Sequence, residues 1–150
     1  MWHLGVDPGA SGALALLGES GEYLDHVRLS STPHDVAAWL REVVELPDCP
    51  GVSAMLERVG SRPGQGVAST FKFGWSAGFV EALLIANCIR YDRVTPAKWQ
   101  QALGCRTKGN KNITKAAAQR RWPTGLRITH AVADALLIAE YGRQKWHDSH

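Results

Sequence analysis

Residues 4–17, LGVDPGASGALALL, constrain the fold more than any other stretch of the chain. An apolar run ends at Asp7, turns at Pro8-Gly9, passes Gly12 and continues into a second apolar run. Two apolar runs joined by a proline–glycine turn predict two antiparallel strands, with Asp7 at the end of the first. A lone aspartate beside such a turn most often caps the local backbone, so this segment alone favours a structural role for Asp7.

The elements that follow alternate between strands and helices. Residues 22–30, 51–57 and 89–94 predict three further strands. A helix is expected to begin at Pro33, after an N-cap at Thr32. Further helices are expected over residues 67–87, 97–103, 113–122 and 128–141. This order predicts an α/β fold in which helices flank a five-stranded mixed sheet. At 150 residues the chain is expected to form a single domain, residues 1–150.

Cysteine usage and hydropathy indicate the compartment. The chain has three cysteines, Cys49, Cys88 and Cys105, without the C-x-x-C spacing of a zinc ribbon, which favours a reducing compartment. No stretch has the length and apolarity of a membrane span, and the first residues lack the pattern of a secretory signal. We therefore expect a soluble cytoplasmic protein without membrane contacts.

Positive charge is concentrated in one part of the chain. The sequence carries a net charge of +3, but nine of its 17 lysine and arginine residues lie between positions 90 and 122, where the only acidic residue is Asp92. A basic segment is often just a solvated face. Segregation this strong favours a polyanionic partner, and nucleic acid is the first candidate.

Three acidic residues are the candidate catalytic groups. Asp7 and Glu57 end two predicted strands, so both carboxylates are expected at one edge of the sheet. Asp134 lies within the apolar helix sequence AVADALLIA, where a buried carboxylate needs a cation or hydrogen-bond donors. A divalent metal ion shared with the other two acids would meet that need. The alternative for this helix alone is that Asp134 faces solvent.

The ligand chemistry favours a particular class of ion. Oxygen ligands without sulfur favour Mg²⁺, with Mn²⁺ as a substitute, over zinc. Two such ions bridged by Asp7 would activate a water and stabilise the leaving oxygen in phosphodiester hydrolysis. His130 lies one helical turn before Asp134 on the same side, so it could ligate a metal, position a water or contact phosphate. A lone histidine near a helix start is as often an ordinary polar residue.

The expected helix over residues 67–87 is mostly apolar, with Lys72 and Glu81 as its charged residues, and should be buried on most sides. Gly74 and Gly78, one turn apart, are unfavourable in a helix unless another backbone approaches closely. They mark either the contact between this helix and the sheet or a subunit interface.

Together these motifs resemble those of RuvC-family Holliday-junction resolvases, of the phage type, within the RNase H-like superfamily. The matching segments follow the family's order and cover nearly the whole chain. They are GVDPGASGALAL around Asp7, LER at Glu57, FGWSAGFVEALL in the central helix, VTPAKWQQALG before a lysine-rich segment, and HAVADALLIA around Asp134.

The resemblance implies an RNase H-like fold and a metal-dependent endonuclease without a nucleotide cofactor. It would act as a homodimer on four-way DNA junctions in recombination, repair or phage DNA processing, in the host cytoplasm if the source is viral. Asp7, Glu57 and Asp134 match the family's metal-binding acids, and Gly74 and Gly78 would lie where central helices pair in the dimer.

We expect a set of basic side chains to contact the DNA backbone, which supplies affinity and register rather than sequence selectivity. They are Arg62, Lys72, Lys98, Lys108, Lys111 and Lys115, of which the last three fall at the family's DNA-contacting lysines.

Two positions depart from the bacterial members of the family. Those members usually have an acid or a histidine three residues before the last aspartate, where this chain has Ala131. Either His130 replaces that ligand, or fewer protein groups hold the second metal. Bacterial members also place a base-stacking aromatic residue just after the glutamate, where this chain reads Arg58-Val59-Gly60. A broader branched-DNA nuclease is therefore an alternative function.

Three further alternatives belong to other functional classes. The first is a related RNase H-like nuclease that acts on RNA. The second is a DNA-binding module that has lost catalysis, although buried carboxylates without a metal would destabilise it. The third is a nucleotide-binding domain of the actin and sugar-kinase type, which needs two such halves and far more residues.

Overall fold

The computed structural model describes residues 1–123 and 125–149. Its strands are β1 (Trp2–Asp7), β2 (Ala13–Leu17), β3 (Tyr23–Arg28), β4 (Val52–Glu57) and β5 (Arg90–Val94). Its helices are α1 (Pro33–Glu45), α2 (Val67–Ala86), α3 (Pro96–Ala102), α4 (Asn112–Arg121) and α5 (His130–Ser149). The elements have the expected type and order, and the prediction of an α/β fold is confirmed.

The strands form one mixed sheet in the order β3-β2-β1-β4-β5. The central strand β1 pairs antiparallel with β2 and parallel with β4, while β3 and β5 form the two edges. Val6 of β1 stands opposite Leu56 of β4, so the two strands finish side by side. Their last residues, Asp7 and Glu57, therefore lie at the same end of the sheet.

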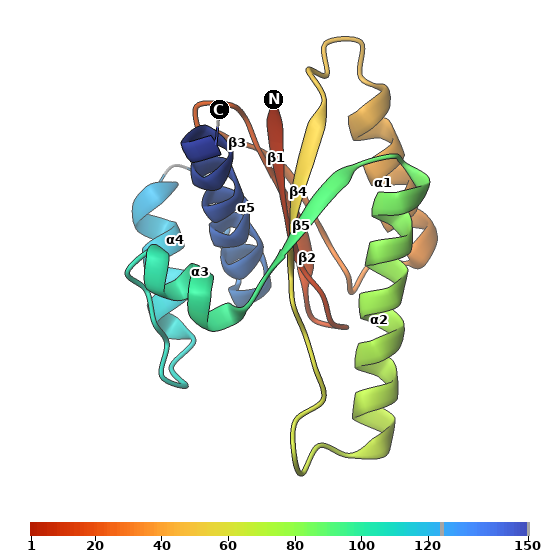
Figure 1. Cartoon of the computed structure of the whole chain (residues 1–150), viewed down its shortest axis with the longest axis vertical. Coiled ribbons are helices and arrows are strands. Elements are labelled where there is room, and N and C mark those ends of the chain that lie inside the picture. The colour runs from red at the N-terminus through yellow and green to blue at the C-terminus, as the bar shows by residue number, and fades with distance from the viewer. Residues whose placement is uncertain (124, 150) are drawn as a thin grey trace.

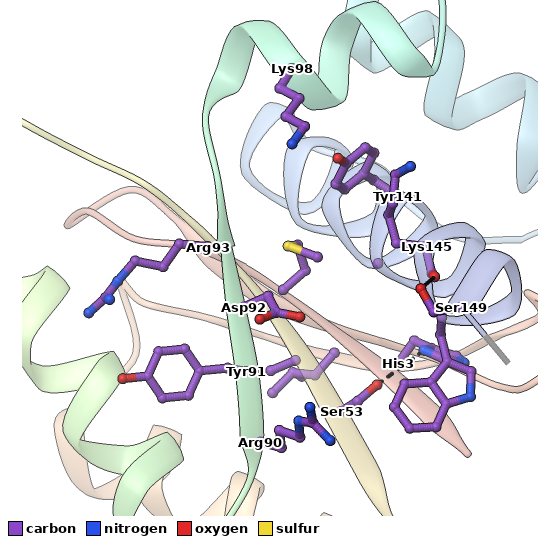
Figure 2. Close-up of a pocket in the computed structure, with 15 residues that line it drawn as sticks. His3, Ser53, Arg90, Tyr91, Asp92, Arg93, Lys98, Tyr141, Lys145 and Ser149 are labelled. Atoms are coloured by element: carbon purple, nitrogen blue, oxygen red, sulfur yellow. Dashed lines mark hydrogen bonds between the residues drawn. The ribbon is translucent and has the colours of Figure 1, made fainter.

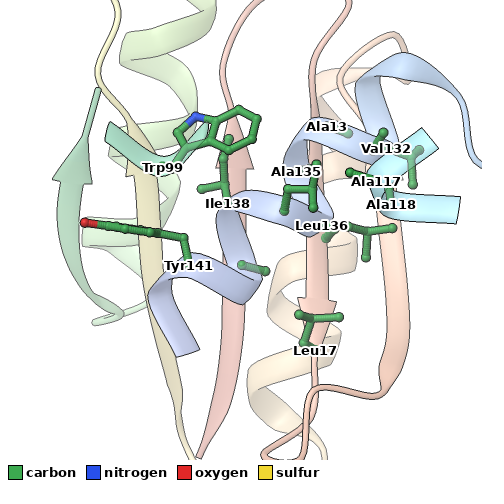
Figure 3. Packing of buried hydrophobic residues seen from close by; sticks show 14 of the residues in the cluster. Ala13, Leu17, Trp99, Ala117, Ala118, Val132, Ala135, Leu136, Ile138 and Tyr141 are labelled. Carbon is green, nitrogen blue, oxygen red and sulfur yellow. The ribbon is translucent and has the colours of Figure 1, made fainter. Parts of the chain in front are cut away.

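Helices cover both faces of the sheet, as Figure 1 shows. Alternate residues of β1, including Leu4 and Val6, face α1 and α2 and form one apolar core with them. The opposite face packs against α3, α4 and α5 in a second core, part of which is drawn in Figure 3. The loops of residues 58–66 and 103–111 extend at the end of the molecule where β1 finishes.

Gly5 allows α5 to pack directly on β1. A Cβ added at Gly5 would lie 2.0 Å from the carbonyl oxygen of Ala135 and 2.4 Å from the backbone nitrogen of Ala139. The strand and the helix therefore touch backbone to backbone, with no room for a side chain between them. This contact fixes the position of Asp134, the residue before Ala135, close to the end of β1.

The sequence correctly located the start of α1 but not the end of α5. Thr32 is the N-cap of α1, where its hydroxyl accepts a hydrogen bond from the Asp35 amide at 3.1 Å. α5 continues to Ser149, beyond the expected end at Tyr141. The polar residues that follow are compatible with a helix because Arg143 pairs with Glu140 one turn earlier, at 2.8 Å.

The expectation that α2 is buried on most sides is wrong. One side of the helix, with Val80 and Leu84, packs in the core, but Phe71 is 73% exposed and Trp75 is 56% exposed. A Cβ added at Gly74 or Gly78 would meet nothing within 4 Å, so these glycines do not mark a contact with the sheet.

Within the described residues, no helix is long and apolar enough to cross a membrane.

Candidate active site

A cavity of about 790 Å³ opens where β1 and β4 end. Its wall is built from the turn after β1, the start of α2, the loop before α4 and the first turns of α5. Segments far apart in the sequence thus meet in one place. The wall contains all of the candidate catalytic residues and half of the candidate DNA contacts, namely Asp7, Glu57, His130, Asp134, Arg62, Lys72 and Lys111.

The turn after β1 is anchored to α2. Gly9 adopts a φ of +127°, which side-chain-bearing residues rarely reach, and its amide donates a hydrogen bond to Ser76 Oγ at 3.2 Å. The ring of Phe73 lies against the same glycine, 3.1 Å from where a Cβ would stand. These contacts hold Asp7 at a defined place on the cavity wall.

Asp7 lies in an environment that opposes its charge. Burial raises the pKa of this carboxyl well above its ordinary value, and the nearby Glu57 and Asp134 carboxylates raise it further. Lys111 acts in the opposite direction. The unfavourable charge of Asp7 would be relieved by a cation placed among the three acids.

Glu57 is positioned by a buried tryptophan. Trp99 of α3 is fully buried, and its Nε1 donates a hydrogen bond to Glu57 Oε2 at 2.6 Å. Burial raises the pKa of Glu57, whereas the hydrogen bond from Trp99 lowers it. Trp99 therefore fixes the orientation of Glu57 and favours its ionised form.

Asp134 faces the cavity rather than solvent. Its Oδ1 is buried and has no hydrogen-bond partner among the described residues. Burial raises its pKa, while the Thr114 hydroxyl, Lys111 and His130 lower it. A buried carboxylate oxygen without a partner is costly, so this atom is available for a ligand from outside the chain.

The three carboxylates fit a hard divalent cation in their chemistry. They supply oxygen ligands, they disfavour one another's charged forms, and one of their oxygens lacks a partner. Within residues 1–123 and 125–149, no three His, Cys, Asp or Glu side chains form a complete metal-binding group. A metal ion is therefore part of the proposal below and not of the observed geometry.

The basic candidates divide into two groups. Arg62, Lys72 and Lys111 line the cavity, and Lys111 is close enough to influence the pKa of all three acids. Lys98, Lys108 and Lys115 do not line it. Lys98 extends instead from α3 toward two other hollows of the surface.

Several cavity residues carry no distinctive signal in the sequence. The wall also includes Arg28, Phe73, Gln100, Thr107 and Thr129. Arg28 ends an edge strand far from the acids in sequence, and only the pairing of β2 with β3 brings it to this end of the sheet. Of these residues, Gln100 and Thr107 have a usable signal, because Thr107 lies in the basic loop before α4 and Gln100 lies in the helix that precedes this loop.

The sheet order, the helices on both faces and the acids at the ends of β1 and β4 define an RNase H-like fold. Two solved structures of RuvC from Thermus thermophilus share this fold with the chain over nearly the full length of both proteins. One, in complex with a Holliday junction substrate, has a TM-score of 0.65 and 18% sequence identity, covering 98% of this chain and 96% of that one. The other has a TM-score of 0.64 and 19% identity, covering 99% and 97%.

The resemblance to RuvC inferred from the sequence motifs is thus confirmed at the level of the fold. No protein-family model matches the chain. No curated protein matches it by sequence.

Proposed function

We propose that this protein is a divalent-metal-dependent endonuclease that cleaves four-way DNA junctions. One observation carries the proposal: carboxylates from β1, β4 and α5 converge on a single cavity that also contains Lys111 and Arg62. The fold is shared with a RuvC structure that holds a Holliday junction substrate. The acidic side chains could hold metal ions for hydrolysis of a phosphodiester bond, and the basic side chains around them could bind the phosphates of a nucleic acid.

In this proposal Asp7, Glu57 and Asp134 would hold two Mg²⁺ ions, with Mn²⁺ as a substitute, and Asp7 would be the ligand common to both. The bound ions would supply a reactive water and stabilise the leaving oxygen of the cleaved strand. Asp134 contributes the oxygen that lacks a protein partner. Asp7 contributes the carboxyl whose charge the surrounding protein disfavours most.

Other side chains prepare the site for its substrate. Trp99 keeps Glu57 oriented and favours its ionised form through the 2.6 Å hydrogen bond. Lys111 favours the ionised form of all three acids. Arg62 and Lys72, from the loop before α2 and its first turns, are placed to contact phosphates at the cavity rim.

His130 is assigned a part in the reaction rather than in folding. It is exposed, it begins α5, and it lines the cavity with Asp134. A positive charge on His130 lowers the pKa of Asp134, as expected for two side chains on the same cavity wall. Replacing His130 with alanine should reduce the rate of cleavage more than the affinity for DNA.

We further propose that the active form is a homodimer. The exposed side of α2 presents large apolar side chains, and Trp75 stacks on Phe79 with ring centroids 5.3 Å apart. Gly74 and Gly78 lie on this helix with open space where a side chain would stand. Close approach of a second α2 would cover this surface and explain two glycines within one helix. Two active sites in one particle suit paired cleavage of a four-way junction.

Strand-resolved cleavage of a synthetic four-way junction tests the proposed function. The reaction is run with Mg²⁺, Mn²⁺ or EDTA, beside linear duplex, three-way and flap DNA. The variants Asp7→Asn, Glu57→Gln and Asp134→Asn serve as inactive controls, each expected to bind the junction and to remain folded. We expect symmetric paired nicks in the four-way junction, dependent on the metal and absent in all three variants.

Two outcomes would replace this function with an alternative. Cleavage of every branched substrate would indicate a broader branched-DNA nuclease, which the missing aromatic residue at Arg58-Val59-Gly60 favours. If the protein binds the junction but cleaves no DNA with any metal, RNA substrates are tested next. If these also remain intact, the protein is a catalytically silent DNA-binding module.

A further inference from the structure

A second cavity, of about 400 Å³, lies on the sheet face that carries the candidate active site, toward the other end of α5. Figure 2 shows its residues. Its floor is formed by β1, β4 and β5, and its side wall by the last turns of α5. Lys98 reaches toward it from α3. Its volume lies within the range of ordinary small-ligand sites.

The sheet register aligns three polar side chains across the floor. His3 of β1 stands opposite Ser53 of β4, and Ser53 stands opposite Arg90 of β5. Residues opposite one another in neighbouring strands face the same side of a sheet, so all three point toward α5. On α5, Tyr141, Lys145 and Ser149 recur every four residues and face the cavity from above.

His3 contributes a buried ring nitrogen without a protein partner to the floor of the cavity. Its side chain is 99% buried, its Nδ1 lies 3.3 Å from Ser53 Oγ, and its Nε2 has no hydrogen-bond partner within the described residues. Burial, with the N-terminal ammonium and His147 nearby, lowers the pKa of His3 to about 4, so the ring is neutral at pH 7. When Ser53 donates to Nδ1, Nε2 carries the ring proton and donates to an acceptor.

The charge of the wall identifies that acceptor as an anion. Arg90 and Lys98 are exposed and form no ion pair in the part of the chain that the structure describes. Lys145 makes a partly exposed pair with Asp148 at 3.7 Å. Asp92 is the acidic residue of the wall and offsets part of this charge. Three cations from three separate elements therefore converge on one hollow.

We propose that this cavity binds a phosphate group, carried either by a free nucleotide or by a nucleic-acid strand. The cations of Arg90, Lys98 and Lys145 surround the phosphate, and Nε2 of His3 donates a hydrogen bond from the floor, while Ser53 holds the His3 ring in place. Phosphate is favoured over a single carboxylate because its several oxygens can accept from donors on three sides at once. Trp146, which is partly exposed, lines the same cavity and gives a base an aromatic surface. The site is separate from the candidate active site and does not depend on its activity.

A nuclear magnetic resonance titration of the full chain tests this site. Inorganic phosphate, adenosine monophosphate and a short thymidine oligonucleotide are added in turn, without divalent metal, to ¹⁵N-labelled protein. We expect changes at the His3 imidazole and at the amides of Ser53, Arg90 and the last turns of α5. Arg90→Gln and Lys145→Gln should each weaken binding about tenfold, because each removes a charge-assisted hydrogen bond.

Two variants separate this site from general charge effects. Arg41→Gln removes an equally exposed cation from α1, and Lys111→Gln removes one from the candidate active site. Neither should change affinity at the His3 resonances. Since the altered side chains are all exposed, thermal unfolding should show folded variants.

The three probes distinguish the sources of the phosphate. Binding of phosphate and the mononucleotide alone identifies a nucleotide site, whereas tighter binding of the oligonucleotide identifies a strand contact. The proposal is overturned if no probe shifts these resonances, or if the shifts follow Lys111 instead. It is also overturned if a short acidic peptide shifts the β5 amides while phosphate does not, since that result indicates a peptide partner on the edge strand.

Discussion

Asp7 is the residue at which the candidate active site opposes folding most directly. Burial and two neighbouring carboxylates disfavour its charge, so its pKa is higher in the folded chain than in the unfolded one. Between those two pKa values the folded state binds the proton more tightly. Without metal, the contribution of Asp7 to stability is therefore greatest below about pH 4 and is lost as the pH rises through the raised pKa.

Asp7→Asn should consequently stabilise the metal-free protein at pH 8. The melting temperature in EDTA should rise by about 2–4 °C for each kcal/mol of repulsion removed, and the gain should vanish near pH 4. Asp48→Asn, at an exposed aspartate, should have no effect at either pH. Mg²⁺ should raise the melting temperature of the wild type but barely that of Asp7→Asn. A less stable Asp7→Asn at pH 8 would mean that this carboxylate is structural.

In the proposed reaction, Trp99 would act through its hydrogen bond to Glu57. In Trp99→Phe the 2.6 Å hydrogen bond is lost, so the pKa of Glu57 should rise. Since Glu57 must be ionised to hold a cation, the acidic limb of the pH–rate profile should move upward by about one unit. The measurement is the cleavage rate of a four-way junction over a range of pH.

The control for this prediction is Trp122→Phe. Trp122 Nε1 also donates a hydrogen bond, at 3.0 Å, but to the carbonyl oxygen of Gly21, away from the acids. It should leave the pH–rate profile unshifted. An equal loss of rate for Trp99→Phe at every pH would indicate that Trp99 serves only packing.

At the scale of elements, the contact between β1 and α5 determines where Asp134 lies. Gly5→Ala should destabilise the protein by about 3 kcal/mol or more, because the new methyl group would overlap backbone atoms of α5. Urea unfolding measures this loss. Gly60→Ala, in an exposed loop with nothing within 4 Å of the added Cβ, should be nearly neutral. A Gly5→Ala variant with near wild-type stability would contradict the backbone contact.

The exposed side of α2 leads to a prediction about assembly. Phe71→Ser and Trp75→Ser should each weaken a dimer at least about tenfold while leaving the fold intact, because both side chains are exposed in the single chain. Sedimentation at several protein concentrations measures the effect. Leu46→Ser, which alters an equally apolar exposed side chain of α1's C-terminal cap, is the control. Unchanged association in both α2 variants would place the interface elsewhere.

The elements also show how far the sequence can predict this structure. The ends of β1 and β4 could be located because turn residues and apolar runs are local signals, and the two acids followed from them. Gly5 and Trp99 could not be identified, because their importance arises from contacts with residues more than forty positions away. The apolar composition of α2 predicted that the helix is buried. Composition alone cannot distinguish side chains buried in the core of one chain from exposed side chains that a second chain would cover.

At the scale of the whole molecule, the basic side chains should control affinity for DNA through salt. Removing one phosphate contact should lower the slope of log binding constant against log salt by about one unit. We expect this for Lys108→Ala, Lys111→Ala and Lys115→Ala, measured with a four-way junction in the absence of metal. Arg41→Ala is the control and should leave the slope unchanged. A slope that no lysine variant alters would remove this segment from the interface.

The helix α5 follows every strand of the sheet along the chain, and this order affects how the protein is made. Until α5 has been synthesised, one face of the sheet, including Ala13, Leu17 and Met55, lacks its main cover and the chain cannot complete its core. The same helix carries Asp134. A chain that has not yet been synthesised through α5 therefore lacks both the cover of the sheet and the third acid of the candidate active site. Completion of the fold and completion of the candidate active site are therefore a single event, and a chain truncated before α5 would be a target for proteolysis.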